Sequence, residues 1–272
     1  MQTSSKNIHN APITVKKALV ILEEFVNADS PLGISEISRK LKANKSTVYR
    51  ILQALSQKGY IQQDPGTNKY ALGFKILQIG VAQLQKISLR EVGKAALETL
   101  AQETLQTARL AILDQDEVVY IDHVEGKDPI RLHLQVGSRG PVYCTAAGKA
   151  ILAHLPEETR SDILSRCHFQ SLTAKTITDR ARFESQLEWV RRSGFSINDE
   201  EFRKEVRAVG APIFNMDGKV IGAIVIVAPS FRLRLRDFPL FGQHVKKAAL
   251  EISKKMGYSL STIQTKENGG KR

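Results

Sequence analysis

One helix-length segment near the N-terminus carries hydrogen-bond donors and cations at positions that share a side. Apolar residues recur there at i, i+3, i+4 and i+7, which predicts one buried helical face: Val48, Ile51, Leu52 and Leu55. The remaining residues then point outward, and they are Lys45, Ser46, Thr47, Tyr49, Arg50 and Gln53. Hydroxyl, amide and guanidinium groups hydrogen-bond base edges and phosphates in a DNA groove. We therefore expect this segment to read duplex DNA.

A second segment, Thr145-Ala146-Ala147-Gly148, has the residue types of a helix start that is open to an anion. Thr145 is a suitable N-cap, and small residues let a ligand approach the backbone N–H groups at the positive end of the helix. A small-residue helix start packed tightly against a sheet fits the same residues equally well. Gly148-Lys149 is not a phosphate loop, because Tyr143 and Ala150 replace the required Gly and Ser or Thr.

Catalytic and metal sites have weak support in the sequence. Cys144 could pair with His123, His133 or His168 as in a Cys/His hydrolase, but a free cysteine is usually a small buried hydrophobe. A zinc site at Cys167-His168 would lack a second ligand pair. We expect a protein that is not an enzyme and that needs neither metal nor cofactor.

Charge is concentrated in the N-terminal third of the chain. The 272 residues include 40 Lys and Arg and 28 Asp and Glu, a formal net charge of +12. Residues 1–87 hold twelve Lys and Arg and five acids, a net charge of +7, so their charge per residue is about three times that of residues 88–272. This asymmetry favours a polyanionic partner for the first part, although a solvated basic face without a partner has the same composition.

Composition also points to a compartment. Two cysteines cannot form a disulfide framework in a chain of this length. The first twelve residues contain no apolar signal region, and no stretch of 18 uninterrupted apolar residues follows. We expect a cytoplasmic protein that does not bind a membrane.

The elements around the DNA-reading segment predict a winged helix-turn-helix over residues 13–72. Thr14 can cap a first helix whose apolar stripe would be buried: Val15, Ala18, Leu19, Leu22 and Val26. A second short helix can start after Ser35, with Ile37 and Leu41 inward, and Asn44 can cap the third. Residues 60–72 read as a β-hairpin around Asp64-Pro65-Gly66, with Lys69 near the tip of the wing.

A connecting helix is expected over residues 73–87. One apolar seam of this helix consists of Phe74, Leu77, Val81 and Leu84. Further apolar residues fall on other sides, and they are Ile76, Ile79 and Ile87. A helix with two apolar faces needs two partners. We interpret one as its own winged domain and the other as the same helix of a second chain; burial inside a monomer is the alternative.

Residues 88–257 alternate strand-like and helical patterns, which predicts an α+β domain. The expected strands are Thr107–Leu113, Glu117–Val124, Ile130–Val136 and Val220–Val227, and the expected helices lie near 89–104, 145–154, 179–193 and 238–256. Residues 1–12 are expected to be a disordered tail, and residues 258–272 are expected to be a flexible C-terminal tail.

Motifs along nearly the whole chain, about residues 13–257, resemble the isocitrate-lyase-regulator (IclR) family of bacterial transcription factors. The segments that carry the resemblance are 15–23, 34–38, 45–52, 59–60, 70–73, 119–122, 136–141, 145–150, 199–201, 206–207 and 211–213. The resemblance implies a winged helix-turn-helix joined by a helix to a larger α/β, GAF-like effector-binding domain. Two positions depart from the family, which usually has Gly where this chain has Lys42 and Glu205.

The resemblance also places an effector site at the Thr145 helix. Carried over by position, the family's further pocket residues fall on Asn198, Ala208, Val225 and Val227. The three apolar groups disfavour a glyoxylate-like ligand, because its oxygens would be left unpaired. We expect instead a carboxylate near Ala146 and Ala147, with an apolar or aromatic body against Leu132, Tyr143, Val225 and Val227.

Together these observations predict a ligand-responsive DNA-binding regulator, with family precedent favouring a repressor. The resemblance implies a homodimer, often paired into a tetramer on DNA, and a two-fold dimer would bind an inverted-repeat operator. Two rivals remain open. One is a small-molecule enzyme with a basic accessory domain, and the other is a constitutive nucleic-acid-binding module with a degenerate sensor.

Overall fold

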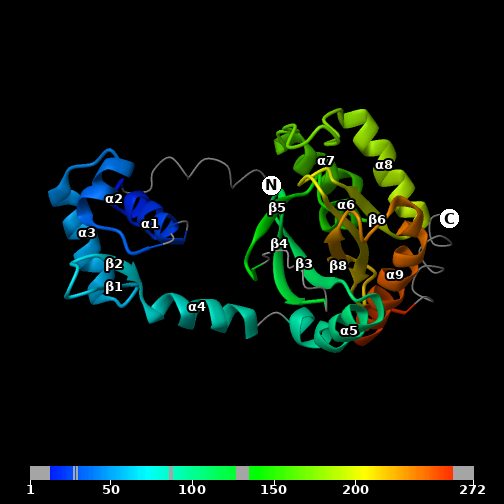
Figure 1. Cartoon of the computed structure of the whole chain (residues 1–272), viewed down its shortest axis with the longest axis horizontal. Coiled ribbons are helices and arrows are strands. Elements are labelled where there is room, and N and C mark those ends of the chain that lie inside the picture. Colours follow the sequence, from blue (N-terminus) through cyan, green and yellow to red (C-terminus); the bar gives the residue numbers. More distant parts are fainter. Residues whose placement is uncertain (1–12, 27, 29, 86–87, 127–134, 260–272) are drawn as a thin grey trace, which may run out of the picture. The chain divides into compact units, whose positions relative to one another are not determined.

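The computed structural model describes residues 13–26, 28, 30–85, 88–126 and 135–259. Contacts divide the chain into two units, Met1–Lys86 and Ile87–Arg272. In Figure 1 the first unit runs from blue to cyan and ends with α4, and the second runs from green to red and begins with α5.

The first unit packs three helices and a hairpin around one small core. Its elements are α1 (Ile13–Val26), α2 (Ile34–Lys40), α3 (Lys45–Gln57), β1 (Ile61–Gln63), β2 (Tyr70–Leu72) and α4 (Phe74–Gln85). Ile37, Val48 and Leu52 are fully buried between α2 and α3, and β1 pairs with β2 in antiparallel register. This arrangement is the predicted winged helix-turn-helix.

The buried side of α1 differs from the predicted stripe. Ile21 and Phe25 are buried, whereas Val15, Leu19 and Val26 are exposed. Nine of the fourteen residues of α1 are apolar, so two overlapping stripes satisfy a helical period. The stripe that buries the Phe25 ring removes the larger apolar area from water, and it faces the core.

Both positions at which the resemblance expects glycine adopt a left-handed backbone. Lys42, between α2 and α3, has φ 48°, and Glu205, before β7, has φ 61°. A side chain with a Cβ is disfavoured there by roughly 1–2 kcal/mol. The turn at Lys42 is nevertheless closed by Ser38, whose hydroxyl donates to the carbonyl of Ala43 at 2.5 Å.

A six-stranded antiparallel sheet in the order β5-β4-β3-β8-β7-β6 organises the second unit. Its strands are β3 (Thr107–Asp114), β4 (Glu117–Val124), β5 (Arg139–Pro141), β6 (Ser196–Asp199), β7 (Val206–Phe214) and β8 (Val220–Pro229). The central strand β8 is buried on both faces. Val225 and Val227 belong to one core, and Ile224 and Ile226 belong to the other.

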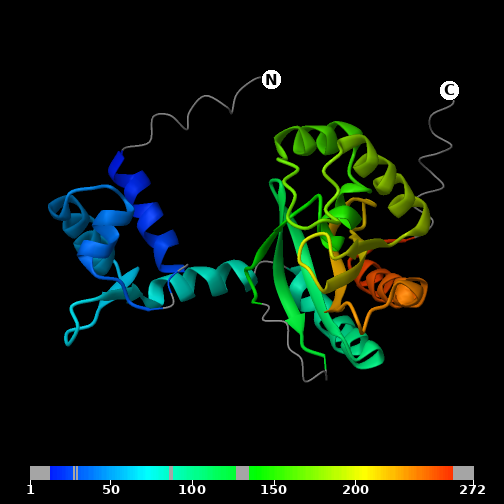
Figure 2. The same ribbon diagram turned by 45° about the horizontal axis from the view of Figure 1, so that its top comes forward.

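Helices cover both faces of this sheet. They are α5 (Ser88–Thr104), α6 (Ala146–Leu152), α7 (Glu157–Arg166), α8 (Arg180–Ser193) and α9 (Phe238–Lys255), with a short 3₁₀ helix η2 (Leu235–Asp237). Figure 2 shows α5 and α9 together on one side and α7 and α8 on the other. The predicted α+β class is confirmed, although β5, β6, β7 and α7 were not among the elements named from the sequence.

Some expectations fall partly outside the described residues. Of the expected strand Ile130–Val136, residues 130–134 are not among the described residues. Its last two residues, 135 and 136, are described and are not in a strand. The tails at 1–12 and 260–272, Ile87 and the side chain of Leu84 lie outside as well. Tyr258, assigned to the flexible tail, instead stacks on Phe214 with ring centroids 5.2 Å apart.

Replacing Lys42 by glycine should stabilise the first unit by up to about 1 kcal/mol, because glycine removes the Cβ penalty at positive φ. Urea unfolding of the full chain, followed by far-ultraviolet circular dichroism, measures the change. Lys58→Gly is the matched control, since Lys58 is also an exposed lysine at a helix end but has φ −89°. Equal effects of the two substitutions would show that φ at Lys42 carries no strain.

Candidate nucleic-acid interface and ligand pocket

Helix α3 presents the predicted DNA-reading residues on the side opposite its buried face. Lys45, Ser46, Tyr49 and Arg50 are exposed, while Thr47 and Gln53 are half-buried. The core residues of α3, Val48, Ile51 and Leu52, fix this orientation. The Asn44 side chain makes no capping hydrogen bond, so the first N–H groups of α3 keep their capacity for a phosphate oxygen.

The wing adds a further cation to the same unit. Lys69 is exposed and lies next to Asn68, which has φ 56°. Asp64 shapes the hairpin turn by accepting hydrogen bonds from the Thr67 amide at 2.6 Å and the Thr67 hydroxyl at 2.8 Å. These bonds lower the pKa of Asp64, so its carboxylate keeps the turn closed near neutral pH.

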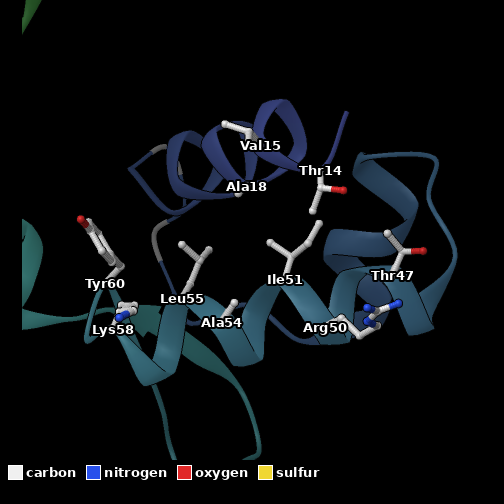
Figure 3. Close-up of a pocket in the computed structure, with 10 residues that line it drawn as sticks. All are labelled: Thr14, Val15, Ala18, Thr47, Arg50, Ile51, Ala54, Leu55, Lys58 and Tyr60. Carbon is white, nitrogen blue, oxygen red and sulfur yellow. The ribbon is translucent and has the colours of Figure 1, made fainter. Parts of the chain in front are cut away.

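A mainly apolar groove of about 450 Å³ lies between α1 and α3 (Figure 3). Val15 and Ala18 of α1 and Ile51 and Leu55 of α3 line it. Figure 3 shows Thr47 and Arg50 at one end and Lys58 and Tyr60 at the other. Arg50 therefore stands at the rim of this groove as well as on the exposed side of α3.

A small cavity of about 70 Å³ in the second unit holds part of the predicted ligand site. Its lining residues are Arg109, Tyr120, Ser138, Arg139, Thr145, Ala146, Asn198, Phe202, Arg203, Val206, Ala208 and Val227. Four of the residues predicted to bind ligand are among them: Ala146, Asn198, Ala208 and Val227. Their role in binding stays a prediction.

Three of the other predicted ligand residues do not line this cavity. Ala147 and Val225 are fully buried and do not line it. Tyr143 lies elsewhere in the same core, where its hydroxyl donates to the Gln170 carbonyl at 3.0 Å and its ring lies 5.0 Å from that of Phe169. Leu132 lies outside the described residues.

Close packing accounts for the small residues at the start of α6. The Thr145 hydroxyl accepts the Gly148 N–H at 3.1 Å, as the predicted cap, and donates to the Pro141 carbonyl at 2.9 Å. A Cβ on Gly148 would lie 2.3 Å from the Val142 carbonyl oxygen. Because α6 spans only seven residues, its dipole offers an anion little.

Arg109 is one of several pocket residues that were not predicted from the sequence, and it is the one that is both charged and buried. Its guanidinium carbon lies 3.3 Å from the centroid of the Tyr120 ring, and Nη2 donates to the Ser138 hydroxyl at 2.7 Å. Burial lowers the pKa of Arg109 to about 10, so the side chain is still protonated at neutral pH. The signal was present in the sequence, since Arg109 is the one charged residue in the otherwise mostly apolar run 107–113.

A buried ion pair joins α6 to the turn that follows β6. Lys149 Nζ lies 2.5 Å from Glu201 Oε1 and 2.8 Å from the Ile197 carbonyl oxygen, and its side chain is fully buried. The Glu201 N–H donates to Asn198 Oδ1 at 2.8 Å. The pair therefore holds Asn198, a pocket residue, in place through Glu201.

Cys144 is unsuited to act as a nucleophile. The thiol is fully buried, and burial raises its pKa to about 12, which disfavours the thiolate. Its one hydrogen bond among the described residues goes to the Pro141 carbonyl at 3.9 Å. The described part of the chain also contains no group of three or more His, Cys, Asp or Glu side chains placed to hold a metal ion.

Comparison with known proteins identifies the family. The family model described as "Bacterial transcriptional regulator IclR C-terminal" matches residues 81–254, and that of the "IclR helix-turn-helix domain" matches residues 14–65. The chain belongs to the IclR family of bacterial transcriptional regulators. This result confirms the resemblance found in the sequence, with a DNA-binding helix-turn-helix followed by a C-terminal effector domain.

The similarity to individual IclR relatives extends over most of this chain and most of each relative. The regulator XynR of Escherichia coli K12 is 33% identical over 245 residues, which is 90% of this chain and 97% of the relative. The transcriptional repressor IclR of the same strain is 28% identical over 88% of each chain. The crystal structure of Thermotoga maritima IclR is 30% identical with TM-score 0.76, covering 90% of this chain and 99% of the other.

Two further features bear on the class of this IclR regulator. These relatives are all named as regulators of transcription, so the enzyme interpretation has no support from them. Among the described residues, no helix has both the length and the hydrophobicity that a membrane crossing would require.

Lys149→Met should destabilise the second unit by about 3–5 kcal/mol, because it leaves the Glu201 carboxylate buried without its cation. Urea unfolding followed by the fluorescence of Trp189, the chain's one tryptophan, measures this loss. Lys175→Met is the matched control: Lys175 pairs with Asp199 and Glu200 but is exposed, and its removal should cost less than about 1 kcal/mol.

The double substitution Lys149→Met with Glu201→Leu should recover most of the stability, since it removes both buried charges. A Lys149→Met protein that is as stable as the parent would contradict the assignment of this pair.

Proposed function

We propose that this regulator represses transcription from an inverted-repeat operator and that a small organic acid, bound in the second unit, controls operator occupancy. The observation that carries the DNA-binding part is the exposed side of α3, where Lys45, Ser46, Tyr49 and Arg50 are turned away from the core residues Val48, Ile51 and Leu52. The name of the E. coli repressor IclR supports repression. Cytoplasmic location follows from this function, because the chromosome is the partner.

Electrostatic attraction to phosphates and hydrogen bonding to bases contribute separately to DNA binding. Lys45 and Lys69 are exposed cations suited to phosphates, and such contacts release condensed counterions and make affinity salt-dependent. Arg50 offers a planar fork that can donate two hydrogen bonds to a guanine. Base selection is therefore assigned to Ser46, Thr47, Tyr49 and Arg50, and general affinity to the lysines.

The exposed apolar side chains of α4 support a homodimer. Phe74, Leu77, Ile79 and Val81 are all substantially exposed in the single chain, with Phe74 at 76%. A helix that is apolar on more than one side needs a partner to remove that surface from water. We assign this role to α4 of a second copy, with a tetramer formed from two such dimers on DNA.

The effector part rests on the cavity at Asn198, Ala146, Ala208 and Val227. A ligand that prefers one arrangement of the dimer changes operator affinity by the coupling free energy, typically about 1–3 kcal/mol, or 5- to 150-fold. Footprinting with and without candidate acids distinguishes this regulator from a constitutive nucleic-acid-binding module, since uniform, salt-sensitive coating of DNA would indicate the module.

Arg50→Ala should weaken binding to the preferred duplex by about 1–3 kcal/mol and relax base preference at one position, if Arg50 pairs with a guanine. Selection from a random duplex library defines that site, and fluorescence anisotropy measures affinity for it. Lys69→Ala is the control, expected to weaken all duplexes uniformly and lower the salt slope by about 0.9. Equal losses for Arg50→Ala on selected and random DNA would assign Arg50 to phosphate.

Leu77→Asp should dissociate the dimer, because it places a carboxylate on the apolar side of α4 that a second copy would cover. Sedimentation velocity at several protein concentrations measures the association. Gln78→Asp, on the same helix at an exposed polar position, should leave it unchanged. A dimer that survives Leu77→Asp would place the subunit interface elsewhere.

A further inference from the structure

We propose that Arg109 is the anion anchor of the pocket in the second unit, and that its guanidinium binds the carboxylate of a small monocarboxylate whose apolar body packs against Phe202, Val206 and Val227. The inference rests on the proposed function, because it names the ligand class and the anchoring residue of that same pocket. It replaces the start of α6, where the sequence analysis had placed the carboxylate.

The first support is a buried cation that has no anionic partner among the described residues. Arg109 is only 4% exposed, and its Nε is buried without a hydrogen-bond acceptor among the described residues. None of the described residues that line the pocket is acidic. Removing a charge from water is costly unless a counterion and hydrogen bonds replace the solvent. A carboxylate from a ligand would supply both.

Neighbouring side chains hold the guanidinium in one orientation. It lies 3.3 Å from the centroid of the Tyr120 ring, and Nη2 donates to Ser138 Oγ at 2.7 Å and more weakly to the Gln135 carbonyl at 3.4 Å. A planar fork that is already fixed loses little conformational entropy when it binds a carboxylate. The geometry is that of a prepared binding group.

The charged residues that line the pocket are all cations. Arg203 also lines the pocket. The pKa of Arg109 is lowered mainly by the burial of Arg109 itself, and the positive charge of Arg203 lowers it further. Arg139 is a third lining cation, but Asp114 and Glu117 already pair with it at 2.7 and 2.6 Å. Among the described residues, no ion pair is formed by the other two lining cations, Arg109, which is buried, and Arg203, which is exposed. An anion bound at Arg109 would relieve the repulsion between them.

The remaining walls define the body of the ligand. Ala208 and Val227 are apolar and buried, and Phe202 and Val206 are half-buried beside them. Asn198 uses its Oδ1 to accept the Glu201 N–H, so its amide nitrogen is the group left to donate. One anionic end and a largely apolar remainder favour a monocarboxylate, with at most one further acceptor near Asn198.

The first experiment compares acids with their neutral amides on the full-length wild-type protein. Benzoate, 4-hydroxybenzoate and pyruvate are titrated by calorimetry beside benzamide, 4-hydroxybenzamide and pyruvamide. At least one acid should bind, and its amide should bind about 10- to 100-fold more weakly, because the charge-assisted hydrogen bonds to Arg109 are lost. The inference is overturned if no acid binds more tightly than its amide.

The second experiment uses variants with the acid that binds best. Arg109→Gln should weaken it by about 10- to 100-fold, whereas Arg203→Gln, which removes an exposed charge from the same pocket, should weaken it less than about 5-fold. Arg109→Lys keeps the charge but loses the fork, so it should retain the preference for acid over amide with lower affinity. Arg109→Gln that binds the acid as tightly as wild type would overturn the inference.

Folding and DNA binding are measured in parallel to keep the outcomes distinct. If Arg109→Gln does not fold by circular dichroism, the acid-to-amide ratios of wild type and Arg109→Lys decide the question. Gel shifts with the duplex selected by wild-type protein test the proposed function separately. Specific duplex binding that an acid changes, with Arg109→Gln responding as wild type does, would retain the proposed function and reject the anchor. Loss of specific duplex binding altogether would reject the proposed function instead.

Discussion

The buried contact between Lys149 and Glu201 is the constraint around which the second unit is arranged. It ties α6 to the turn after β6, although 52 residues separate the two side chains in sequence. Both charged side chains are buried away from water. The contact therefore requires that α6 start at the Thr145 cap and that the turn after β6 close over the ion pair. Ala146 and Asn198 face one pocket because these two segments are held together.

Local patterns were sufficient for much of the fold. The apolar period of α3, the cap at Thr145 and the hairpin around Asp64 depend on residues within one or two turns of each other, and the structure contains each of these elements. Asn44 is at the N-cap position of α3, as predicted, but its side chain makes no capping hydrogen bond. The register of α1 could not be decided in this way. Two apolar stripes fit its sequence, and only packing against α3 and the hairpin selects the one with Phe25.

The pocket was harder to predict because its composition depends on strand order. Ala208 and Val227 were placed by resemblance, whereas Tyr120 and Ser138, which contact the Arg109 guanidinium, lie 11 and 29 residues further along the chain. Nothing local indicates that β3 is central, with β4 and β8 beside it. Tyr143 does not line the cavity for a related reason: it lies only two residues from Thr145, but its ring packs against Phe169.

The boundary between the two units, at Lys86 and Ile87, has an evolutionary consequence. All residues of the cavity belong to the second unit, and all the exposed groups of α3 belong to the first. Substitutions at the exposed groups of α3 therefore leave the lining of the cavity unchanged, and the reverse holds as well. If the proposed function holds, paralogues of such a chain can diverge in DNA target and in ligand as separate traits.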